Sequence, residues 1–482
     1  MNPVTSETTT VRHVVAMPYP GLSHINSMMN LCRLLISKTD DKLILITFVV
    51  TEEWLLLMRS EPKPDNIYFA SIPNVIPSEV GRAADINGFF EAVMTKMEAP
   101  FEQLLDRIKP RVTLIMCDSL LFWAVGVGNR RHIPVASFWP MSATMFSIFQ
   151  HWDLLVQNKH YPVDLSGEDM LCSTWFSPNI MGNEHVDYIP GVSPTRLMDF
   201  PLLINGSDPH ILRRFCDIVS WVSKAQYLLI SSIYELERRT IDALRAKFCF
   251  PIYTIGPAIP CFKLEDNSCL SPEKINEPNY MHWLNCQPNR SVIYISFGSF
   301  HSVSGAQMDE IAGGLKNSGV RFLWVARGET SSSSSKLEEA CGNNNMWGML
   351  VPWCDQLRVL SHPSVGGFLT HCGWNSVIEG LFAGVPSLTF PLGMDQMTNS
   401  KMIEEDWKIG WRVRKLAEVE NLVSRDAIRE HVVKFMDLES NEGKQMRRRV
   451  KEVQEKCEDA IAKDGSSEIN IKSFIRYISQ YS

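Results

Sequence analysis

The sequence lacks the features that would place the protein in a membrane or on a nucleic acid. No apolar run reaches about 18 residues, the length that a membrane-spanning helix needs. The start, MNPVTSETTTVRH, is polar, whereas a signal peptide has a charged start and an apolar core. The net charge is −7, so no overall basic field attracts nucleic acid. We therefore expect a cytoplasmic protein with no membrane span and no nucleic-acid partner.

Two common kinds of site are also missing. The 12 cysteines are scattered, and no two form the C-x-x-C pair typical of redox or zinc sites, so we expect reduced, mostly buried thiols. No Walker-type phosphate loop is present. The partial dinucleotide fingerprint GVGNRR (126–131) has an arginine in place of its third glycine and falls between a predicted helix and a strand. A structural turn explains this segment better.

What the sequence does contain is material for two α/β domains. Its 482 residues, 45% hydrophobic and 21% charged, exceed the size at which one core keeps growing. Apolar runs such as HVVAM, KLILITFVV and VTLIMCD alternate with helical patterns, and a second series begins at SVIYISFGS. This alternation predicts parallel sheets. We predict an N-terminal domain (1–250), a linker (251–280) rich in proline, asparagine and charge, a C-terminal domain (281–460), and a final helix (461–482) that packs back on the first domain.

Polar segments follow three predicted strands of the second domain. Trp353 and Gln356 follow GMLVPW, HCGWNS (371–376) follows GGFLT, and PLGMDQ (391–396) follows PSLTF. Ligands of open parallel sheets lie outside the carboxyl ends of the strands, so we expect these segments to converge. Because HCGWNS begins a helix, its backbone N–H groups and the helix dipole favour an anion such as a diphosphate.

The remaining side chains suit the other parts of a nucleotide sugar. Glu379 lies one helical turn after Asn375, where a carboxylate can accept hydrogen bonds from ribose hydroxyls. Trp353 offers a flat face to a base, and Asp395 and Gln396 suit sugar hydroxyls. Each residue alone has a simpler explanation, because serine and asparagine cap many helices and tryptophan is more often core. Their joint spacing favours a binding site.

The segment from Trp353 to Gln396 resembles the signature box of plant UDP-sugar-dependent glycosyltransferases that act on small molecules. The resemblance includes the opening WCDQ, the HCGWNS core, Glu379 and the closing Asp395–Gln396. It continues through MHWLNCQPNRSVIYISFGS (281–299), SSIYELE and PYPGLSHINSMMNL. It implies the GT-B fold, in which two Rossmann-like domains with parallel sheets face each other across a cleft.

The resemblance also assigns roles to the donor-binding residues. It implies that Trp353 stacks on uracil beside the backbone of Cys354, and that Gln356 and Glu379 hold the ribose. A closing glutamine is similar to that of glucose-using members, so UDP-glucose is the expected donor. The residues implied for the diphosphate and the sugar are Ser299, His371, Gly373, Trp374, Asn375, Ser376, Asp395 and Gln396.

Two residues of the first half are candidates for the proton transfer. His24 lies in the loop after the first predicted strand, and a positioned histidine suits general-base catalysis. Asp118 ends the run VTLIMCD, where it could orient the imidazole. A helix-starting role for His24 and a capping role for Asp118 are the competing explanations, and the capping role is compatible with the catalytic one. The resemblance matches both positions and implies that they act as catalytic residues across the cleft.

The expected function is inverting transfer of glucose from UDP-glucose to a hydroxyl of a small, largely apolar acceptor, such as a phenolic, flavonoid or terpenoid-like compound. Apolar segments such as SFWPMSATMFSIF favour such an acceptor. No acidic cluster resembles a metal site, so we expect no cofactor and no metal, and the resemblance suggests a monomer. The alternatives are a non-catalytic UDP-sugar binding protein and another nucleotide-sugar enzyme, such as an epimerase or a hydrolase.

Overall fold

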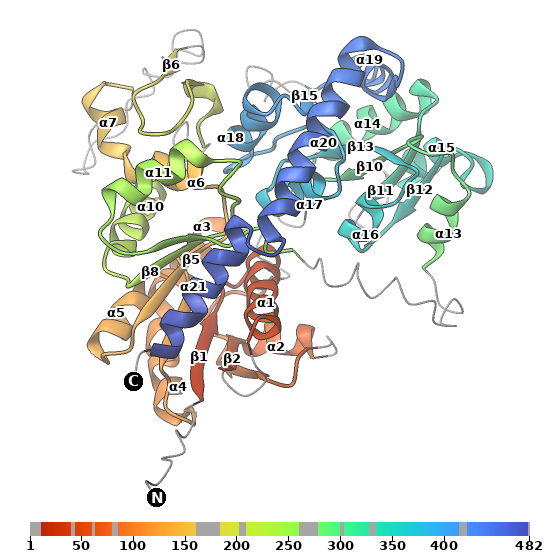
Figure 1. The fold of residues 1–482 in the computed structure, drawn as a ribbon. Helices are drawn as coiled ribbons and strands as arrows, with labels where there is room; N and C mark the ends of the chain where they lie inside the picture. Colours follow the sequence, from red (N-terminus) through yellow and green to blue (C-terminus); the bar gives the residue numbers. More distant parts are fainter. Residues whose placement is uncertain are drawn as a thin grey trace, which may run out of the picture. The chain divides into compact units, whose positions relative to one another are not determined.

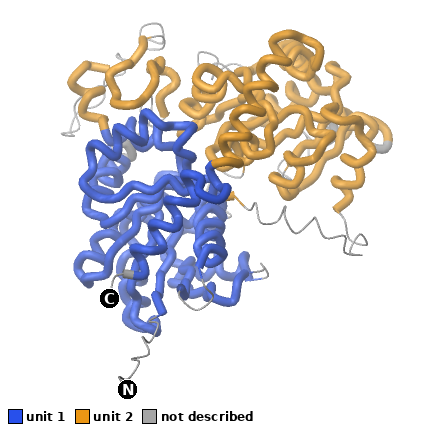
Figure 2. Tube along the Cα trace, in the orientation of Figure 1, with its two compact units in different colours: residues 1–150, 213–258, 460–482 blue, residues 151–212, 259–459 orange. Residues whose placement is uncertain are grey.

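The computed structural model describes residues 11–39, 44–59, 63–79, 85–160, 184–201, 209–259, 278–298, 303–326, 334–413 and 422–480. The chain forms two compact units, drawn in different colours in Figure 2. Unit 1 takes its residues from 1–150, 213–258 and 460–482, and unit 2 from 151–212 and 259–459. The chain therefore leaves unit 1 twice and returns to it at its end.

Unit 1 is built on a seven-stranded sheet in the order β3-β2-β1-β4-β5-β8-β9, in which all neighbours are parallel. Its strands are apolar runs whose residues are almost all buried, as expected when helices cover both faces of a sheet. The strands are β1 (Arg12–Met17), β2 (Ile44–Thr51), β3 (Ile67–Ile72), β4 (Leu114–Asp118), β5 (Val135–Trp139), β8 (Tyr227–Ile230) and β9 (Ile252–Thr254).

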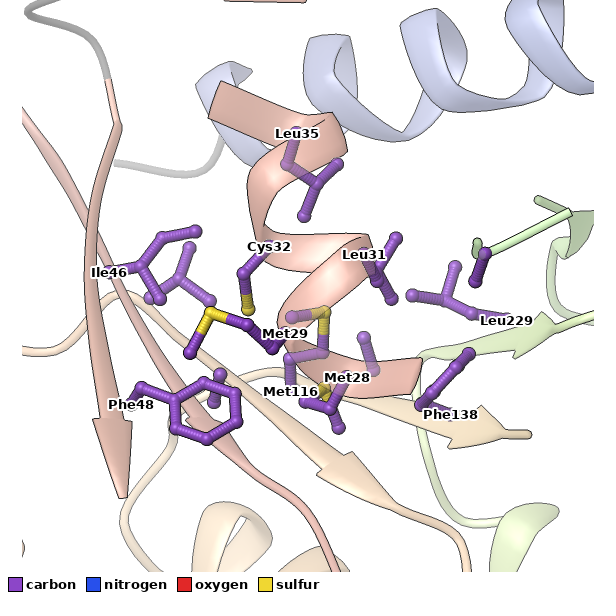
Figure 3. Packing of buried hydrophobic residues seen from close by; sticks show 14 of the residues in the cluster. Met28, Met29, Leu31, Cys32, Leu35, Ile46, Phe48, Met116, Phe138 and Leu229 are labelled. Atoms are coloured by element: carbon purple, nitrogen blue, oxygen red, sulfur yellow. The ribbon is translucent and has the colours of Figure 1, made fainter. Parts of the chain in front are cut away.

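The helices of unit 1 cover this sheet (Figure 1). Helix α1 (Leu22–Ser37) presents an apolar stripe to the strands, and Figure 3 shows its residues Met28, Met29, Leu31, Cys32 and Leu35 packed with Ile46, Phe48, Met116, Phe138 and Leu229. The other helices are α2 (Glu52–Met58), α3 (Ile86–Lys96), α4 (Glu98–Arg107), α5 (Phe122–Arg130), α6 (Ala143–Gln150), α10 (Pro209–Val222), α11 (Arg238–Lys247) and α21 (Ser466–Gln480).

The last helix, α21, belongs to the core of unit 1. Its residues Ile471, Phe474 and Ile478 are buried in the same cluster as the apolar face of α1. Asn470 Nδ2 also donates to the carbonyl oxygen of Thr254 in β9, at 2.9 Å. The C-terminal residues are therefore an integral layer of unit 1.

Unit 2 is built on a six-stranded parallel sheet in the order β12-β11-β10-β13-β14-β15. Its strands are β10 (Val292–Ser296), β11 (Arg321–Val325), β12 (Gly348–Val351), β13 (Val365–Thr370), β14 (Ser387–Thr389) and β15 (Gly410–Arg412). A two-stranded antiparallel pair, β6 (His185–Val186) and β7 (Thr195–Arg196), lies outside this sheet.

From β10 onward the helices of unit 2 alternate with its strands, as the sequence predicted. They are α7 (Trp152–Gln157), η2 (Leu197–Asp199), α13 (Asn279–Asn285), α14 (Gly305–Ser318), α15 (Ser334–Cys341), η5 (Asn343–Asn345), α16 (Gln356–Leu360), α17 (Trp374–Phe382), α18 (Gln396–Lys401), the π-helical turn η6 (Met402–Asp406), α19 (Arg425–Met436) and α20 (Asn441–Ile461). The predicted α/β class with two parallel-sheet domains is confirmed.

In both sheets the first strand lies in the interior, so the strand order reverses beside it. In unit 1 the reversal lies between β1 and β4, and in unit 2 between β10 and β13. Ligands of open α/β sheets bind outside the carboxyl ends of the strands at such a point. The topology alone therefore directs attention to the residues after Met17, Asp118, Ser296 and Thr370.

The observed units differ from the predicted boundaries in two places. The described residues between 151 and 212 group with unit 2, although the prediction assigned them to the N-terminal domain. The predicted linker, 251–280, begins with β9 of the first sheet, and residues 260–277 lie outside the described part of the chain.

Among the described helices, none is both long enough and apolar enough to cross a membrane.

Candidate functional site

The reversal point of the first sheet brings His24 and Asp118 together. Strands β1 and β4 pair in parallel with Met17 opposite Cys117, so the chain segments that follow them start side by side. Asp118 is the last residue of β4, and His24 lies in the first turn of α1. The two residues are 94 positions apart in sequence, yet His24 Nδ1 lies 2.7 Å from Asp118 Oδ2.

The hydrogen bonds of Asp118 define how the imidazole is held. Its side chain is fully buried, and its second oxygen, Oδ1, accepts a hydrogen bond from the backbone N–H of Leu120 at 3.0 Å. The His24 side chain is 18% exposed, and its ring lies 5.2 Å from that of Tyr19. A carboxylate at Nδ1 assigns the ring proton to that nitrogen. Nε2 is then the basic atom, as in a histidine that acts as a general base.

The reversal point of the second sheet carries the predicted diphosphate loop. Ser296 at the end of β10 pairs with Thr370 at the end of β13, and His371, Cys372 and Gly373 lead from β13 into α17. Helix α17 begins at Trp374, and its N-cap residue, Gly373, provides no side-chain cap. Such a helix start presents backbone N–H groups and the positive end of the dipole to an anion.

Two glycines make room for the imidazole of His371. A Cβ atom on Gly298 or on Gly373 would lie 2.5 Å from His371 Nε2, too close for any real contact. Gly298 also has a φ of +78°, which favours glycine. The loop after β10 and the start of α17 therefore fit closely around this side chain. Ser299, the next residue, lies outside the described residues, so its predicted role stays a prediction.

The predicted ribose residues form one hydrogen-bonded group. Gln356 Nε2 donates to Glu379 Oε2 at 2.8 Å and to Ser376 Oγ at 3.0 Å. Gln356 Oε1 accepts from the hydroxyl of Tyr294 in β10 at 3.2 Å. Burial raises the pKa of the Tyr294 phenol well above its usual value, so the hydroxyl stays protonated and can donate. Tyr294 thereby fixes which end of the Gln356 amide faces Glu379.

The residues predicted to hold the base differ in exposure. Trp353 is 62% exposed, as a platform for a planar ligand must be. Cys354 is buried, and its Sγ lies 3.3 Å from the hydroxyl oxygen of Tyr294. Burial raises the pKa of the Cys354 thiol to about 11 and that of Cys372 to about 12. Both thiols are therefore neutral near pH 7 and are not activated nucleophiles.

The residues predicted to read the sugar are more deeply placed. Gln396 is 5% exposed, and its Oε1 accepts hydrogen bonds from the backbone of Leu392 and Gly393, so its amide nitrogen is the group left for a sugar hydroxyl. Trp374 is 3% exposed and its ring packs 6.5 Å from that of Trp407, so a sugar contact there would come from its backbone. Asp395 is half-buried and accepts from Asn399 Nδ2 at 2.8 Å.

The sequence analysis missed two residues that hydrogen-bond to predicted site residues: Tyr294 to Gln356 and Asn399 to Asp395. Tyr294 lies in an apolar strand and looks like core, although a buried tyrosine hydroxyl usually has a partner. Asn399 follows Asp395 by four residues on a helix, the same spacing that links Asn375 to Glu379. That spacing was the available signal.

No group of three metal-ligating side chains occurs among the described residues.

Known proteins resemble this chain over almost its whole length. Residues 248–430 match the family described as "UDP-glucoronosyl and UDP-glucosyl transferase". UDP-glycosyltransferase 87A2 from Arabidopsis thaliana is 48% identical over 479 residues, which covers 99% of each chain. The 7-deoxyloganetin glucosyltransferase of Catharanthus roseus is 31% identical over 489 residues, covering 97% of this chain and 96% of that protein.

Solved structures show the same fold. Medicago truncatula UGT71G1, complexed with UDP-glucose, has a TM-score of 0.79 at 24% identity and covers 98% of this chain and 100% of its own. Os79 from O. sativa, in complex with U2F and trichothecene, has a TM-score of 0.79 at 26% identity. The match covers 96% of this chain and 100% of that one. The two parallel-sheet units described above are thus the two units of a known architecture.

Proposed function

This chain belongs to the plant UDP-glycosyltransferase family, and we propose that it transfers glucose from UDP-glucose to a hydroxyl of a small, largely apolar acceptor, with inversion at the anomeric carbon. The observation that carries the proposal is the 2.7 Å hydrogen bond between His24 Nδ1 and Asp118 Oδ2. It supports a histidine base on the acceptor hydroxyl, as one-step displacement requires.

The proposed reaction assigns each group a part. His24 Nε2 takes the proton of the acceptor hydroxyl while the acceptor oxygen attacks the anomeric carbon, and Asp118 stabilises the imidazolium that forms. The bond between the anomeric carbon and the diphosphate oxygen breaks, and the leaving UDP carries the negative charge. His371 and the start of α17 stabilise that charge. A single displacement from the opposite face inverts the configuration.

The sugar and the acceptor are supported by different observations. Asp395 and the amide nitrogen of Gln396 offer one acceptor and one donor to sugar hydroxyls, and a similar solved structure is a complex with UDP-glucose. The names of similar proteins mention 7-deoxyloganetin and a trichothecene, which supports a small-molecule acceptor. We also propose that the reaction needs no metal ion, because the helix start and His371 can serve the diphosphate.

Product analysis tests this proposal. The protein is incubated with UDP-glucose, UDP-galactose or UDP-glucuronate and a panel of phenolic and terpenoid alcohols, with and without EDTA. We expect mass spectrometry to detect a hexosylated product chiefly from UDP-glucose, unchanged by EDTA, and proton NMR to show the β configuration. An α-linked product would contradict inversion, and loss of product with EDTA would contradict metal independence. Binding of UDP-glucose without transfer to any alcohol would favour a non-catalytic protein.

A further inference from the structure

Helix α18 is unusual because it is polar and wholly buried. All six residues from Gln396 to Lys401 are buried, and five of them are polar. A buried polar group is costly unless it is hydrogen-bonded, so hydrogen bonds must place this helix. Thr398 Oγ1 donates to the carbonyl oxygen of Asp199 at 2.8 Å, and Ser400 Oγ lies 2.8 Å from Thr389 Oγ1.

Two ion pairs hold the last residue of the helix and the residue that Thr398 contacts. The fully buried carboxylate of Asp199 pairs with Arg412, and Lys401 Nζ donates to Asp406 Oδ1 at 2.7 Å. These contacts do not involve Asn399. The helix therefore has enough anchors to stay in place when the side chain of Asn399 is changed.

Asn399 connects two parts of the donor site. Its side chain is fully buried, and both hydrogens of its Nδ2 are used: one bond goes to Asp395 Oδ2 at 2.8 Å and the other to the carbonyl oxygen of Cys372 at 2.9 Å. Its Oδ1 is buried and has no hydrogen-bond partner among the described residues. The hydrogen bonds that this side chain makes to the described residues are therefore the two that it donates.

The carbonyl that Asn399 holds belongs to the diphosphate loop. Cys372 stands between His371 and Gly373 and has a φ of +68°, which a non-glycine residue rarely adopts. Its N–H donates to Thr370 Oγ1 at 3.1 Å, so Thr370 and Asn399 fix the peptide units on the two sides of this residue. Asn399 thus joins the conformation of that loop to the position of the Asp395 carboxylate.

We propose that Asn399 is a positioning residue for donor recognition, which holds the sugar-reading carboxylate of Asp395 and the diphosphate loop at Cys372 in one fixed arrangement. The inference rests on the proposed use of UDP-glucose. It predicts that loss of the two donated bonds impairs discrimination between UDP-glucose and its 4-epimer, UDP-galactose, and also weakens binding of UDP, since one side chain serves both parts of the site.

The test compares Asn399→Ala with Thr398→Val, a control in the same buried helix that also loses a hydrogen bond, the one from Thr398 Oγ1 to the carbonyl oxygen of Asp199. Calorimetry measures the affinity of each variant for UDP, UDP-glucose and UDP-galactose, and thermal unfolding measures stability. We expect Asn399→Ala to reduce the preference for UDP-glucose by roughly tenfold, the loss typical of a hydrogen bond to a charged group. Thr398→Val should keep the wild-type preference even where its melting temperature falls as far as that of Asn399→Ala.

A second variant keeps the shape of the side chain. In Asn399→Asp two carboxylates face each other in place of an amide and a carboxylate, so they repel unless they share a proton. The preference for UDP-glucose should therefore be low at pH 8 and recover as the pH falls and the shared proton restores a hydrogen bond, a pH profile that the wild type lacks. A purely structural role of Asn399 would not produce it.

The outcomes separate the inference from the proposed function. A wild-type protein that binds UDP-glucose and UDP-galactose equally would overturn the proposed donor and the inference with it. A wild-type preference that survives in both Asn399 variants, or that Thr398→Val reduces equally, would overturn the inference alone. A reduced preference in the Asn399 variants with an intact control supports it.

Discussion

At the scale of single residues, the close fit around His371 is the feature of the diphosphate loop that is most easily disturbed. Gly298 and Gly373 each leave no room for a Cβ atom beside Nε2. Because the neighbouring atom belongs to a ring that the loop must hold in place, an added methyl group has to displace the imidazole. The two glycines are therefore expected to matter for the ligand more than for the fold.

Gly298→Ala should weaken UDP binding by about 10- to 100-fold, the effect of losing a hydrogen bond to a charged group. The matched control is Gly319→Ala, since Gly319 has a similar φ of +67° but a Cβ atom added there would have nothing within 4 Å. The control should lose about 1 kcal/mol of stability and keep its UDP affinity. Calorimetry with UDP measures the affinity of each variant, and thermal unfolding measures its stability. Equal UDP affinities in Gly298→Ala and Gly319→Ala would refute the role given to Gly298.

The sequence predicted which polar side chains would meet where each follows an apolar run or lies one helical turn from another. His24 and Asp118 follow apolar runs, and the structure brings them within hydrogen-bonding distance. Gln356 and Glu379 also meet, 2.8 Å apart. Tyr294 was not predictable, because a tyrosine in an apolar strand looks like core until its hydroxyl is seen against Gln356. The predicted ligand contacts of these residues stay predictions.

At the scale of secondary structure, strand β1 carries a buried histidine that makes unit 1 sensitive to pH. His13 Nδ1 donates to the carbonyl oxygen of Pro110 and Nε2 accepts from Thr47 Oγ1, each at 2.7 Å. Burial lowers the pKa of His13 from its ordinary value of 6.5. The folded state therefore favours the neutral ring, and its stability is complete above pH 6.5 and declines as the pH falls below that value.

We expect wild-type unit 1 to lose stability as the pH falls below about 6.5, by at most about 1.4 kcal/mol per pH unit from this one group. His13→Asn keeps a donor for Pro110 but cannot titrate, so its loss over the same range should be smaller. Urea unfolding of both proteins at several pH values gives the difference, in which the other titrating groups cancel. Parallel pH profiles would show that His13 does not contribute.

Element prediction succeeded where the apolar pattern was strong and failed where hydrogen bonds decide. The apolar runs of both halves form the strands of the two sheets, and HCGWNS leads into a helix as expected. The predicted linker includes strand β9, because its three residues are too few to show a pattern beside the proline-rich segment that follows. Helix α18 gives no apolar signal because its buried residues are polar.

At the scale of the whole molecule, the return of the chain to unit 1 makes its last helix a test of how independent the two units are. Phe474 in α21 is fully buried, and its ring lies 5.8 Å from that of Tyr227 and 5.9 Å from that of Tyr253. The residues predicted to bind UDP-glucose, from Trp353 to Gln396, lie in unit 2. A substitution in the core of α21 should therefore lower the stability of unit 1.

Phe474→Ala should destabilise unit 1 by about 3–5 kcal/mol, as removal of a buried phenylalanine usually does. Scanning calorimetry should then show an earlier transition for unit 1, while UDP raises only the transition of unit 2. Ile469→Ala, on the same helix and 49% exposed, should change stability by no more than about 0.5 kcal/mol. Equal shifts of both transitions in Phe474→Ala would contradict separate unfolding.

Domain organisation was predictable from length and alternation, but one assignment was beyond the sequence. The described residues between 151 and 212 precede the linker, yet Ser193, Arg196 and Asp199 bond to the chain around 398–412 in unit 2. These contacts join charged residues some 200 positions apart, and no local pattern reports such a pairing. Sequence order alone therefore assigned the segment to the N-terminal half, whereas its contacts group it with unit 2.

The proposed sugar transfer requires His24 as its base, and turnover by His24→Ala, measured together with UDP binding, tests that role. Asn26→Ala, an exposed position on the same helix, is the control. We expect turnover of UDP-glucose with an acceptor to fall by about 10²- to 10⁴-fold in His24→Ala, with UDP affinity unchanged and the control active. Turnover retained in His24→Ala would contradict it.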